Sequence, residues 1–357
     1  MKILLWCLCV TAFTTVCQRD FSPTAPTSYV WPSASPESQG CDHQQLQSAF
    51  EEADERGFIN AIVITRNGYL VAERYFNGCH PNQPQQVHSV SKSILSALVG
   101  IALREGHISN LGTPVVDYFP EYSASIRDDR INSITLYHLL TMKTGFASDT
   151  HSYMDIFYSA NWILTTFEQP LLFAPGSSFR YNTGGTHMLA GALTRATSQD
   201  LKHFAIKHLF DPLGIHVGQW KRDPQGNYCG GNHMFFTPRD MARFGWLYMN
   251  EGALEGKQIV PQEWVRESLR VHYKSTSEGW GELEDIGYGY LWWLGTLKSR
   301  PVFLALGHGG QFILCVPELN MVITVCSDSA NRDWDWADQQ ERSVLDVVGN
   351  FIFPGIK

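Results

Sequence analysis

The stretch SVSKSILSALVGIALR, residues 89–104, has the pattern of an α-helix. Its apolar residues recur at helical spacing, and Gly106 follows as a stop signal. Ser89 and Lys92 are three residues apart at its beginning, so their side chains lie on nearly the same face. The stretch therefore predicts an apolar helix whose first turn carries a hydroxyl and an amine.

Strand signals lie on both sides of this helix. Before it, β-rich residues 60–65 and 69–75 flank Asn67-Gly68, a strong hairpin signal. After it comes a helix-rich region, and then strand signals return before a closing helix. The predicted helices are 136–142, 184–195, 201–210, 238–250 and 342–351, and the later predicted strands are 288–294, 302–306, 311–316 and 321–326.

This order of elements predicts an α+β fold. An antiparallel sheet is built from both ends of the chain, is flanked by terminal helices and carries an inserted helical subdomain. We expect one domain over residues 38–353, with a sheet part at 38–88 and 286–353 and a helical part at 89–285. Such an arrangement leaves a cleft between the two parts, where ligands commonly bind.

The amino terminus has the composition of a secretory signal peptide. Lys2 precedes an apolar, Thr-rich run within residues 1–17, and a Pro/Ser-rich linker follows at 18–37. We expect export to the periplasm or the exterior. A lipid anchor at Cys17 is the alternative, although the residues before Cys17 lack the expected small residue. No apolar run reaches the length of a spanning helix.

Composition excludes several classes of protein. The 357 residues are 44% hydrophobic and 17% charged, which suits a packed core. A net charge of −8 argues against nucleic acid as the partner. The 13 histidines are dispersed and no metal-binding motif is present, so no metal or other cofactor is expected.

The eight cysteines do not form a disulfide framework. If residues 312–316 and 321–326 form a hairpin, Cys315 faces Val322 and Cys326 faces Gln311. The two sulfurs are then ~13 Å apart along the ladder, too far for a bond. A bridge between Cys79 and Cys229 stays open.

Three separate segments carry candidate chemistry. Backbone N–H groups at a helix start can hold an oxyanion, and a neutral Lys92 can take the proton of Ser89. Tyr181, in a loop before Gly184-Gly185, could shuttle a proton. The glycine-rich run 307–310 suggests close backbone approach, with the N–H of Gln311 as a second oxyanion donor beside that of Ser89. The alternative for each is structural: a solvated helix start, a packing aromatic and a glycine bulge.

Taken together in this order, the segments resemble the serine β-lactamase and penicillin-recognising family. The resemblance spans residues 38–353 and is greatest to the class C-like branch of esterases, D-amino-acid peptidases and 6-aminohexanoate-dimer hydrolases. It implies that Ser89 is the acylated nucleophile, Lys92 its base and Tyr181 the proton shuttle. It also assigns substrate binding to His308, Gly309 and Gly310, in place of the Lys-Thr-Gly of true β-lactamases, and to Thr183.

Two departures bear on the substrate. His308 gives a weaker, pH-dependent positive charge than lysine, and Thr183 stands where penicillin-hydrolysing members carry asparagine. A literal Lys-Thr-Gly at 143–145 lies before Tyr181 and is interpreted as unrelated to the motif.

We therefore expect an exported serine hydrolase that cleaves a small ester, amide or short peptide through an acyl-enzyme on Ser89. One alternative is a D,D-carboxypeptidase or β-lactamase that acts on peptidoglycan-like or β-lactam substrates. An alternative of another class is a binding protein on an inactive hydrolase fold. Trp292 and Trp293 are candidate substrate walls, although core packing is the simpler reading for both.

Overall fold

The computed structural model describes residues 29–147, 149–277, 279–330 and 333–357. The predicted signal peptide and Cys17 lie outside these residues. The sheet is antiparallel and eight-stranded, and it combines both ends of the described chain, as predicted. Its order is β2 (Tyr69–Tyr75), β1 (Ile59–Arg66), β12 (Met321–Ser327), β11 (Gln311–Val316), β10 (Arg300–Gly307), β9 (Trp293–Leu297), β8 (Leu283–Tyr288) and β7 (Tyr273–Lys274).

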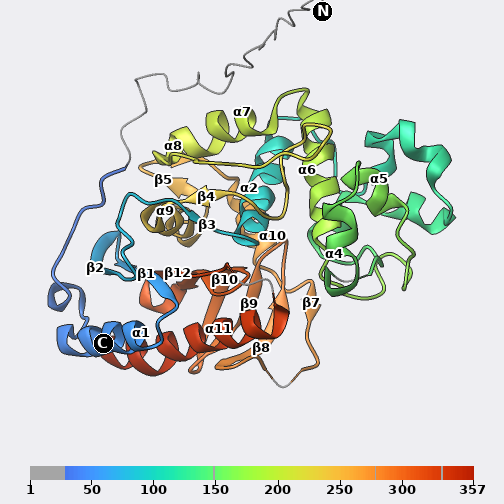
Figure 1. Cartoon of the computed structure of the whole chain (residues 1–357). Coiled ribbons are helices and arrows are strands. Elements are labelled where there is room, and N and C mark those ends of the chain that lie inside the picture. The colour runs from blue at the N-terminus through green and yellow to red at the C-terminus, as the bar shows by residue number, and fades with distance from the viewer. Residues whose placement is uncertain (1–28, 148, 278, 331–332) are drawn as a thin grey trace, which may run out of the picture.

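Helices cover both faces of the sheet. On one face in Figure 1 lie α1 (His43–Glu55) and α11 (Trp334–Asp346), which continues as a π-helical segment, Val347–Ile352, that packs on α1. On the other face lie α2 (Val90–Arg104) and α9 (Pro238–Met249). The remaining helices are α3 (Leu136–Leu140), α4 (Asp149–Phe157), α5 (Trp162–Phe167), α6 (Thr183–Thr197), α7 (Leu201–Ala205), its π-helical continuation Ile206–Phe210, α8 (Asp211–Leu213) and α10 (Gln262–Ser268).

The smaller elements complete the structure. Two-stranded ribbons pair β3 (Gln85–Gln86) with β4 (Phe235–Phe236) and β5 (Ala253–Leu254) with β6 (Lys257–Gln258). Single 3-10 turns are at Glu37–Gln39, Val115–Tyr118, Pro120–Ser125, Asp129–Ser133, Pro317–Leu319 and Phe353–Gly355. Within the described part of the chain, no helix has the length and apolar character needed to cross a membrane.

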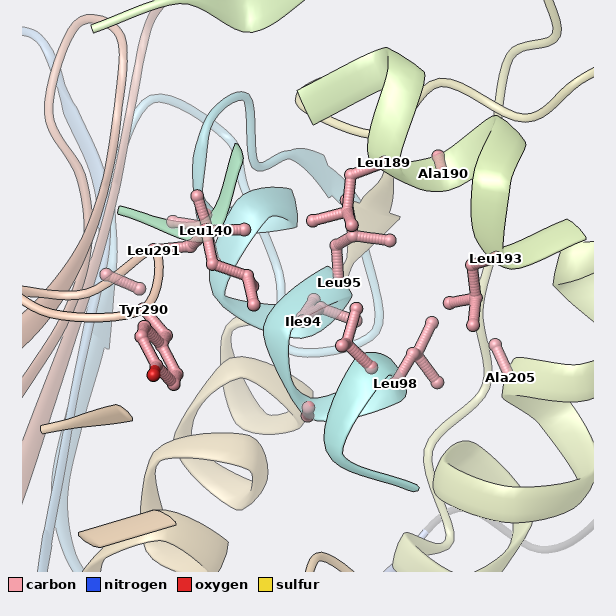
Figure 2. Packing of buried hydrophobic residues seen from close by; sticks show 14 of the residues in the cluster. Ile94, Leu95, Leu98, Leu140, Leu189, Ala190, Leu193, Ala205, Tyr290 and Leu291 are labelled. Carbon is pink, nitrogen blue, oxygen red and sulfur yellow. The ribbon is translucent and has the colours of Figure 1, made fainter. Parts of the chain in front are cut away.

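The helix predicted from residues 89–104 is the central helix of the core. Nearly all of α2 is buried, because strands β10 and β11 and helices α6 and α10 surround it. Figure 2 shows Leu95 and Leu98 directed toward Leu189 and Leu193 of α6, while Leu140 and Leu291 lie on the other side of α2. A helix that is apolar on all sides needs such a location. The N-cap residue of α2, Ser89, by contrast, lines the cavity described below.

The predicted hairpin is confirmed. Asn67 and Gly68 both have positive φ, 53° and 83°, which a tight two-residue hairpin turn requires. The predicted register of Cys315 opposite Val322 is also confirmed. The five cysteines of the described residues, which include Cys79 and Cys229, are free thiols.

The structure corrects the strand predicted at 288–294. Residues 289–292 form a bend between β8 and β9, in which Gly289 N–H donates to Trp292 O and Leu291 has a φ of 60°. A Cβ at Gly289 would stand 1.9 Å from the carbonyl oxygen of Ser268, so only glycine fits. An apolar aromatic run has the same composition in a strand and in a buried bend, and Gly289 was the signal for the bend.

The other boundaries differ more modestly. The closing helix begins at Trp334 instead of residue 342, because Asp333 caps it by accepting from Trp336 N–H. The sheet already includes β7 and the start of β8, so it begins before residue 286. The described part of the predicted linker packs on the domain: Trp31 is buried, and its indole N–H donates to Arg239 O.

Candidate active site

Ser89 occupies the N-cap position of α2. Its side chain makes no capping hydrogen bond, so the hydroxyl is not used to satisfy the helix's own N–H groups. The preceding residue, His88, has a φ of 46°, in the left-handed region. Ser89 Oγ therefore lies at the positive end of a buried helix. The N–H groups of Val90, Ser91 and Lys92 donate to the carbonyl oxygens of Val87, His88 and Ser89.

Lys92 lies one turn along α2 and is 1% exposed. Its Nζ donates to Ser89 Oγ at 2.8 Å, to Thr183 Oγ1 at 2.9 Å and to Gly231 O at 2.9 Å. A buried amine costs much free energy unless its hydrogen atoms have acceptors, and these three acceptors meet that need. The amine is thereby fixed against the hydroxyl.

Tyr181 completes the cluster from a distant segment. The Lys92 Nζ lies 4.7 Å from the centroid of the Tyr181 ring, and that ring stacks on Trp293 at 6.0 Å. Asn182 holds the segment in place, because its side chain accepts from Gly185 N–H at 2.6 Å and caps α6. The structure thus brings together Ser89, Lys92 and Tyr181, with Thr183 beside them.

Gly231 was not anticipated from the sequence. It lies in a loop fixed by a buried pair, His187 Nε2 and Asp223 Oδ2, which are 2.8 Å apart. Burial raises the pKa of Asp223, but hydrogen bonds from His187 and Asn227 outweigh that effect and leave the pKa below its ordinary value. A Cβ at Gly231 would reach 2.4 Å from Thr186 Oγ1 and 3.1 Å from Lys92 Nζ. The Gly230-Gly231 pair was the available signal for this close approach.

The glycine-rich run is at the end of β10, beside the segment that precedes Ser89. A Cβ at Gly307 would stand 2.3 Å from Val87 O and 3.1 Å from the Cβ of His88. His308 follows in the turn between β10 and β11, and its ring lies 5.6 Å from the His88 ring. The strand end therefore abuts the segment that leads into Ser89.

The predicted role of Gln311, to donate its backbone N–H to the oxyanion, stays a prediction. Gln311 is fully buried as the first residue of β11, and its side chain donates to Ser327 O at 2.8 Å. It is not among the described residues that line the cavity, and neither are Gly309 and Gly310, whereas His308 and Thr183 are. The run 308–310 forms a turn instead of a strand, and Gln311 follows it directly opposite Gly307.

A cavity of about 950 Å³ opens onto Ser89. It lies between the sheet part and the helical part, as expected. Trp293 lines it, whereas Trp292 is fully buried in the core. The aromatic lining residues are Tyr153, Phe157, Phe179, Tyr181, Tyr273, Trp280, Trp293 and Trp334.

The Lys-Thr-Gly sequence at residues 143–145 lies away from the cavity. Lys143, of the literal Lys-Thr-Gly, donates to His272 O and is not one of the described lining residues. Its placement agrees with the interpretation that this motif is unrelated to the site.

Among the residues the structure describes, no cluster of three or more histidine, cysteine or acidic side chains could hold a metal ion.

Comparison with known proteins identifies the family. The family model described as Beta-lactamase matches residues 46–346. The 6-aminohexanoate-dimer hydrolase of Paenarthrobacter ureafaciens is 25% identical over 314 residues, which cover 83% of this chain and 80% of the relative.

Solved structures show the same fold. One is from Bacillus anthracis and is provisionally named a 6-aminohexanoate-dimer hydrolase. Its TM-score is 0.73 at 24% identity, and the match covers 92% of this chain and 88% of the Bacillus anthracis chain. A D-stereospecific amidohydrolase from Streptomyces sp. has a TM-score of 0.66 at 16% identity, and the match covers 85% of this chain and 98% of the amidohydrolase chain. Since the family model spans more than half of the sequence, the chain belongs to the beta-lactamase family and is a serine hydrolase of that family.

Proposed function

We propose that this enzyme hydrolyses esters or amides of uncharged, hydrophobic acyl compounds through an acyl-enzyme on Ser89. The observation that carries the proposal is the cluster at the start of α2. There, Lys92 Nζ contacts Ser89 Oγ at 2.8 Å while facing the Tyr181 ring. A hydroxyl beside a buried amine at a helix N-terminus is an activated nucleophile.

The reaction proceeds in two halves. With Lys92 neutral, its Nζ accepts the proton of Ser89 as Oγ bonds to the substrate carbonyl carbon, and the carbonyl oxygen becomes an oxyanion. The intermediate collapses by breaking the bond to the leaving group, which takes a proton relayed through Lys92 and Tyr181. Water then attacks the acyl-enzyme, gives up a proton to the same pair and releases the acid, which restores Ser89.

The oxyanion needs two donors. The N–H of Ser89 is one, as expected from the sequence. The N–H of Gln311, the first residue of β11, is the second, also as expected from the sequence. The support is that Gln311 pairs with Gly307, which packs on the segment that leads into Ser89. Removal of one such donor typically costs ~3 kcal/mol of the barrier.

The lining of the cavity favours an uncharged substrate. Phe179 stacks on Tyr273 at 4.4 Å, and Tyr181 stacks on Trp293, so one wall is a continuous aromatic surface. Arg342, the arginine among the described lining residues, is already bonded to Asp338, and Glu341 is adjacent to it. A carboxylate-bearing β-lactam or peptide would therefore find little net positive charge, whereas an aromatic or aliphatic group would bury its surface on the wall.

Labelling and turnover test the proposal together. A fluorophosphonate probe should add its mass once to the wild-type protein and not to Ser89→Ala. In a panel of nitrophenyl esters, nitrocefin and D-amino-acid amides, kcat/KM should be highest for esters with aromatic or medium-length acyl groups. Equal labelling of both proteins would refute the acyl-enzyme, and preferred turnover of nitrocefin or the amides would redirect the function to β-lactams or peptides.

We also propose that the enzyme is exported. The support is the sequence pattern of residues 1–17, a positive start followed by an apolar run. Expression of the full chain in a bacterial host, followed by fractionation and measurement of the intact mass, should recover a shortened protein outside the cytoplasm. A full-length protein that stays in the cytoplasm would contradict export.

A further inference from the structure

Residues 220–234 form an antiparallel ribbon, and residues 230–232 are a bulge in it. Lys221, on the opposite side of the ribbon, bonds to the residues at both ends of the bulge. Its N–H donates to His233 O at 3.2 Å, and its carbonyl oxygen accepts from Cys229 N–H at 2.9 Å. The three residues between these partners are therefore extra residues that the ribbon pushes outward, and bulges of this kind re-aim groups next to active sites.

The bulge brings the carbonyl oxygen of Gly231 to the amine of Lys92. The two atoms are 2.9 Å apart, and Lys92 Nζ is also 2.9 Å from Thr183 Oγ1 and 2.8 Å from Ser89 Oγ. A neutral amine has two N–H bonds and one lone pair. When the N–H bonds point at Gly231 O and Thr183 Oγ1, the lone pair is left for the proton of Ser89. The position of Gly231 O therefore sets the direction in which Lys92 can act as a base.

One face of α6 supports the bulge. Thr186 and His187 lie three and four residues after Thr183 on this helix, so the three side chains share a face. A Cβ at Gly230 would stand 2.2 Å from Thr186 O, and one at Gly231 would stand 2.4 Å from Thr186 Oγ1. The bulge therefore lies directly on the helix, where an added side chain would push it away.

Asp223 fastens the tip of the ribbon to the same face of α6. One carboxylate oxygen accepts from His187 Nε2 at 2.8 Å and from Asn227 Nδ2 at 2.9 Å. The other accepts from the backbone N–H groups of Gln225 and Asn227 at 2.9 and 2.8 Å. Asp223 and His187 are both buried, where a hydrogen bond to a charged group is stronger than in water. A single carboxylate thus closes the turn of the ribbon and ties that turn to the helix.

We propose that His187 and Asp223 are positioning residues for Lys92, because they fasten the ribbon whose bulge supplies the Gly231 carbonyl. This inference rests on the proposed function, in which Lys92 is the base that activates Ser89. Neither side chain is among the described residues that line the cavity, so both act through the backbone at Gly231 and not on the substrate. A displacement of about 1 Å at a catalytic group can cost a factor of ~100 in rate, so loss of the pair should slow the chemistry more than it weakens binding.

Steady-state kinetics on a nitrophenyl ester and fluorophosphonate labelling of Ser89 can test this role. His187→Leu is similar in size but cannot donate to Asp223. It should lower kcat and the labelling rate by about 10- to 100-fold with KM nearly unchanged. His187→Gln should recover most of both rates, since its amide N–H can donate to the same carboxylate. Arg222→Gln, which removes an exposed ion pair with Asp200 from the same ribbon, is the matched control and should behave as wild type.

A second variant covers the case in which His187→Leu does not fold. Asn227→Ala removes one hydrogen bond from the Asp223 carboxylate at a half-buried position, and it should show a smaller fall in kcat with KM again nearly unchanged. Urea unfolding identifies the variants that are folded under assay conditions. Wild-type kcat in folded His187→Leu or Asn227→Ala would overturn the positioning role, as would a change confined to KM or a failure of His187→Gln to recover kcat.

Ser89→Ala and Lys92→Met, assayed in parallel, separate the two proposals. If Ser89→Ala is inactive and Lys92→Met is slow while the His187 variants match wild type, only the positioning role fails. If Ser89→Ala retains activity, or Lys92→Met is labelled as fast as wild type, the proposed function itself fails.

Discussion

Gly307 lies so close to Val87 that a Cβ added to it would stand 2.3 Å from the Val87 carbonyl oxygen. Val87 comes two residues before Ser89, the proposed nucleophile, and Gly307 comes immediately before His308. This contact joins the edge of the cavity built by the sheet to the edge built by α2. The spacing between the two proposed oxyanion donors therefore depends on the absence of a side chain at residue 307.

We expect Gly307→Ala to impair both stability and catalysis. The added methyl group must push the strand end away from residues 87–88, and overpacking of this kind typically lowers the free energy of unfolding by ~1–3 kcal/mol. kcat should fall more than KM rises. Gly112→Ala is a suitable control, because its Cβ would meet only the end of the Asn110 side chain at 3.0 Å. Urea unfolding and ester hydrolysis measure the two effects, and an unchanged kcat in folded Gly307→Ala would contradict this role of the contact.

Lys92→Met should slow labelling of Ser89 by a fluorophosphonate by a factor of about 10²–10⁴, the usual contribution of a positioned base. Methionine is similar in length and suits a buried position, so the fold should persist. Lys143→Met tests the literal Lys-Thr-Gly in the same assay, and it should label at the wild-type rate because Lys143 bonds to His272 O away from the cavity. Equal rates for Lys92→Met and wild type would rule out Lys92 as the base.

The adjacent tryptophans should respond in opposite ways. Trp292→Ala empties a fully buried site and should lower the free energy of unfolding by ~3–5 kcal/mol. Trp293→Ala removes part of the aromatic wall, so it should raise KM for an aromatic ester more than for an acetyl ester. Denaturant unfolding and a two-substrate comparison separate these effects. An equal rise in KM for both esters in Trp293→Ala would argue against the aromatic wall as the site that binds the acyl group.

The pair of His187 and Asp223 should make stability sensitive to acid. The pKa of Asp223 is lowered in the fold, so its contribution is present above the unfolded pKa of about 4 and is lost as pH falls through the folded value. Asp223→Asn should therefore be clearly less stable than wild type at pH 7, and the difference should shrink below pH ~4. Urea unfolding at pH 7 and pH 3 gives the two values, and a constant difference would show that ionisation of Asp223 contributes nothing.

Glu341 should affect stability in the opposite direction. Its folded pKa of about 8 exceeds the unfolded value near 4.3, so the folded state binds more protons between these values and stability falls as pH rises through that window. Glu341→Gln removes this loss. Relative to wild type, the variant should gain about 3–4 kcal/mol of unfolding free energy between pH 5 and pH 8. Urea unfolding at both pH values provides the test, and no relative gain would mean that Glu341 is ionised throughout.

The sequence predicted the elements whose signals are local. The hairpin at Asn67-Gly68 and the α2 helix follow from turn chemistry and periodicity, and both are confirmed. The strand expected at 288–294 was wrong, because a buried bend and a buried strand share the same apolar composition. The π-helical end of α11 had no sequence signal that we used.

The candidate site divides in the same way. The spacing of Ser89 and Lys92 along one helix fixes their proximity before any tertiary contact forms, because residues one turn apart face the same side. The sequence alone thus determined the pair, its place at the start of an apolar helix and the family pattern around it. The tertiary structure decided the rest: that Gly231 binds Lys92, that His308 rather than Gln311 borders the cavity, and that His187 and Asp223 hold the loop of Gly231. These contacts join residues far apart in the chain, and only packing of the sheet against the helices sets their distances.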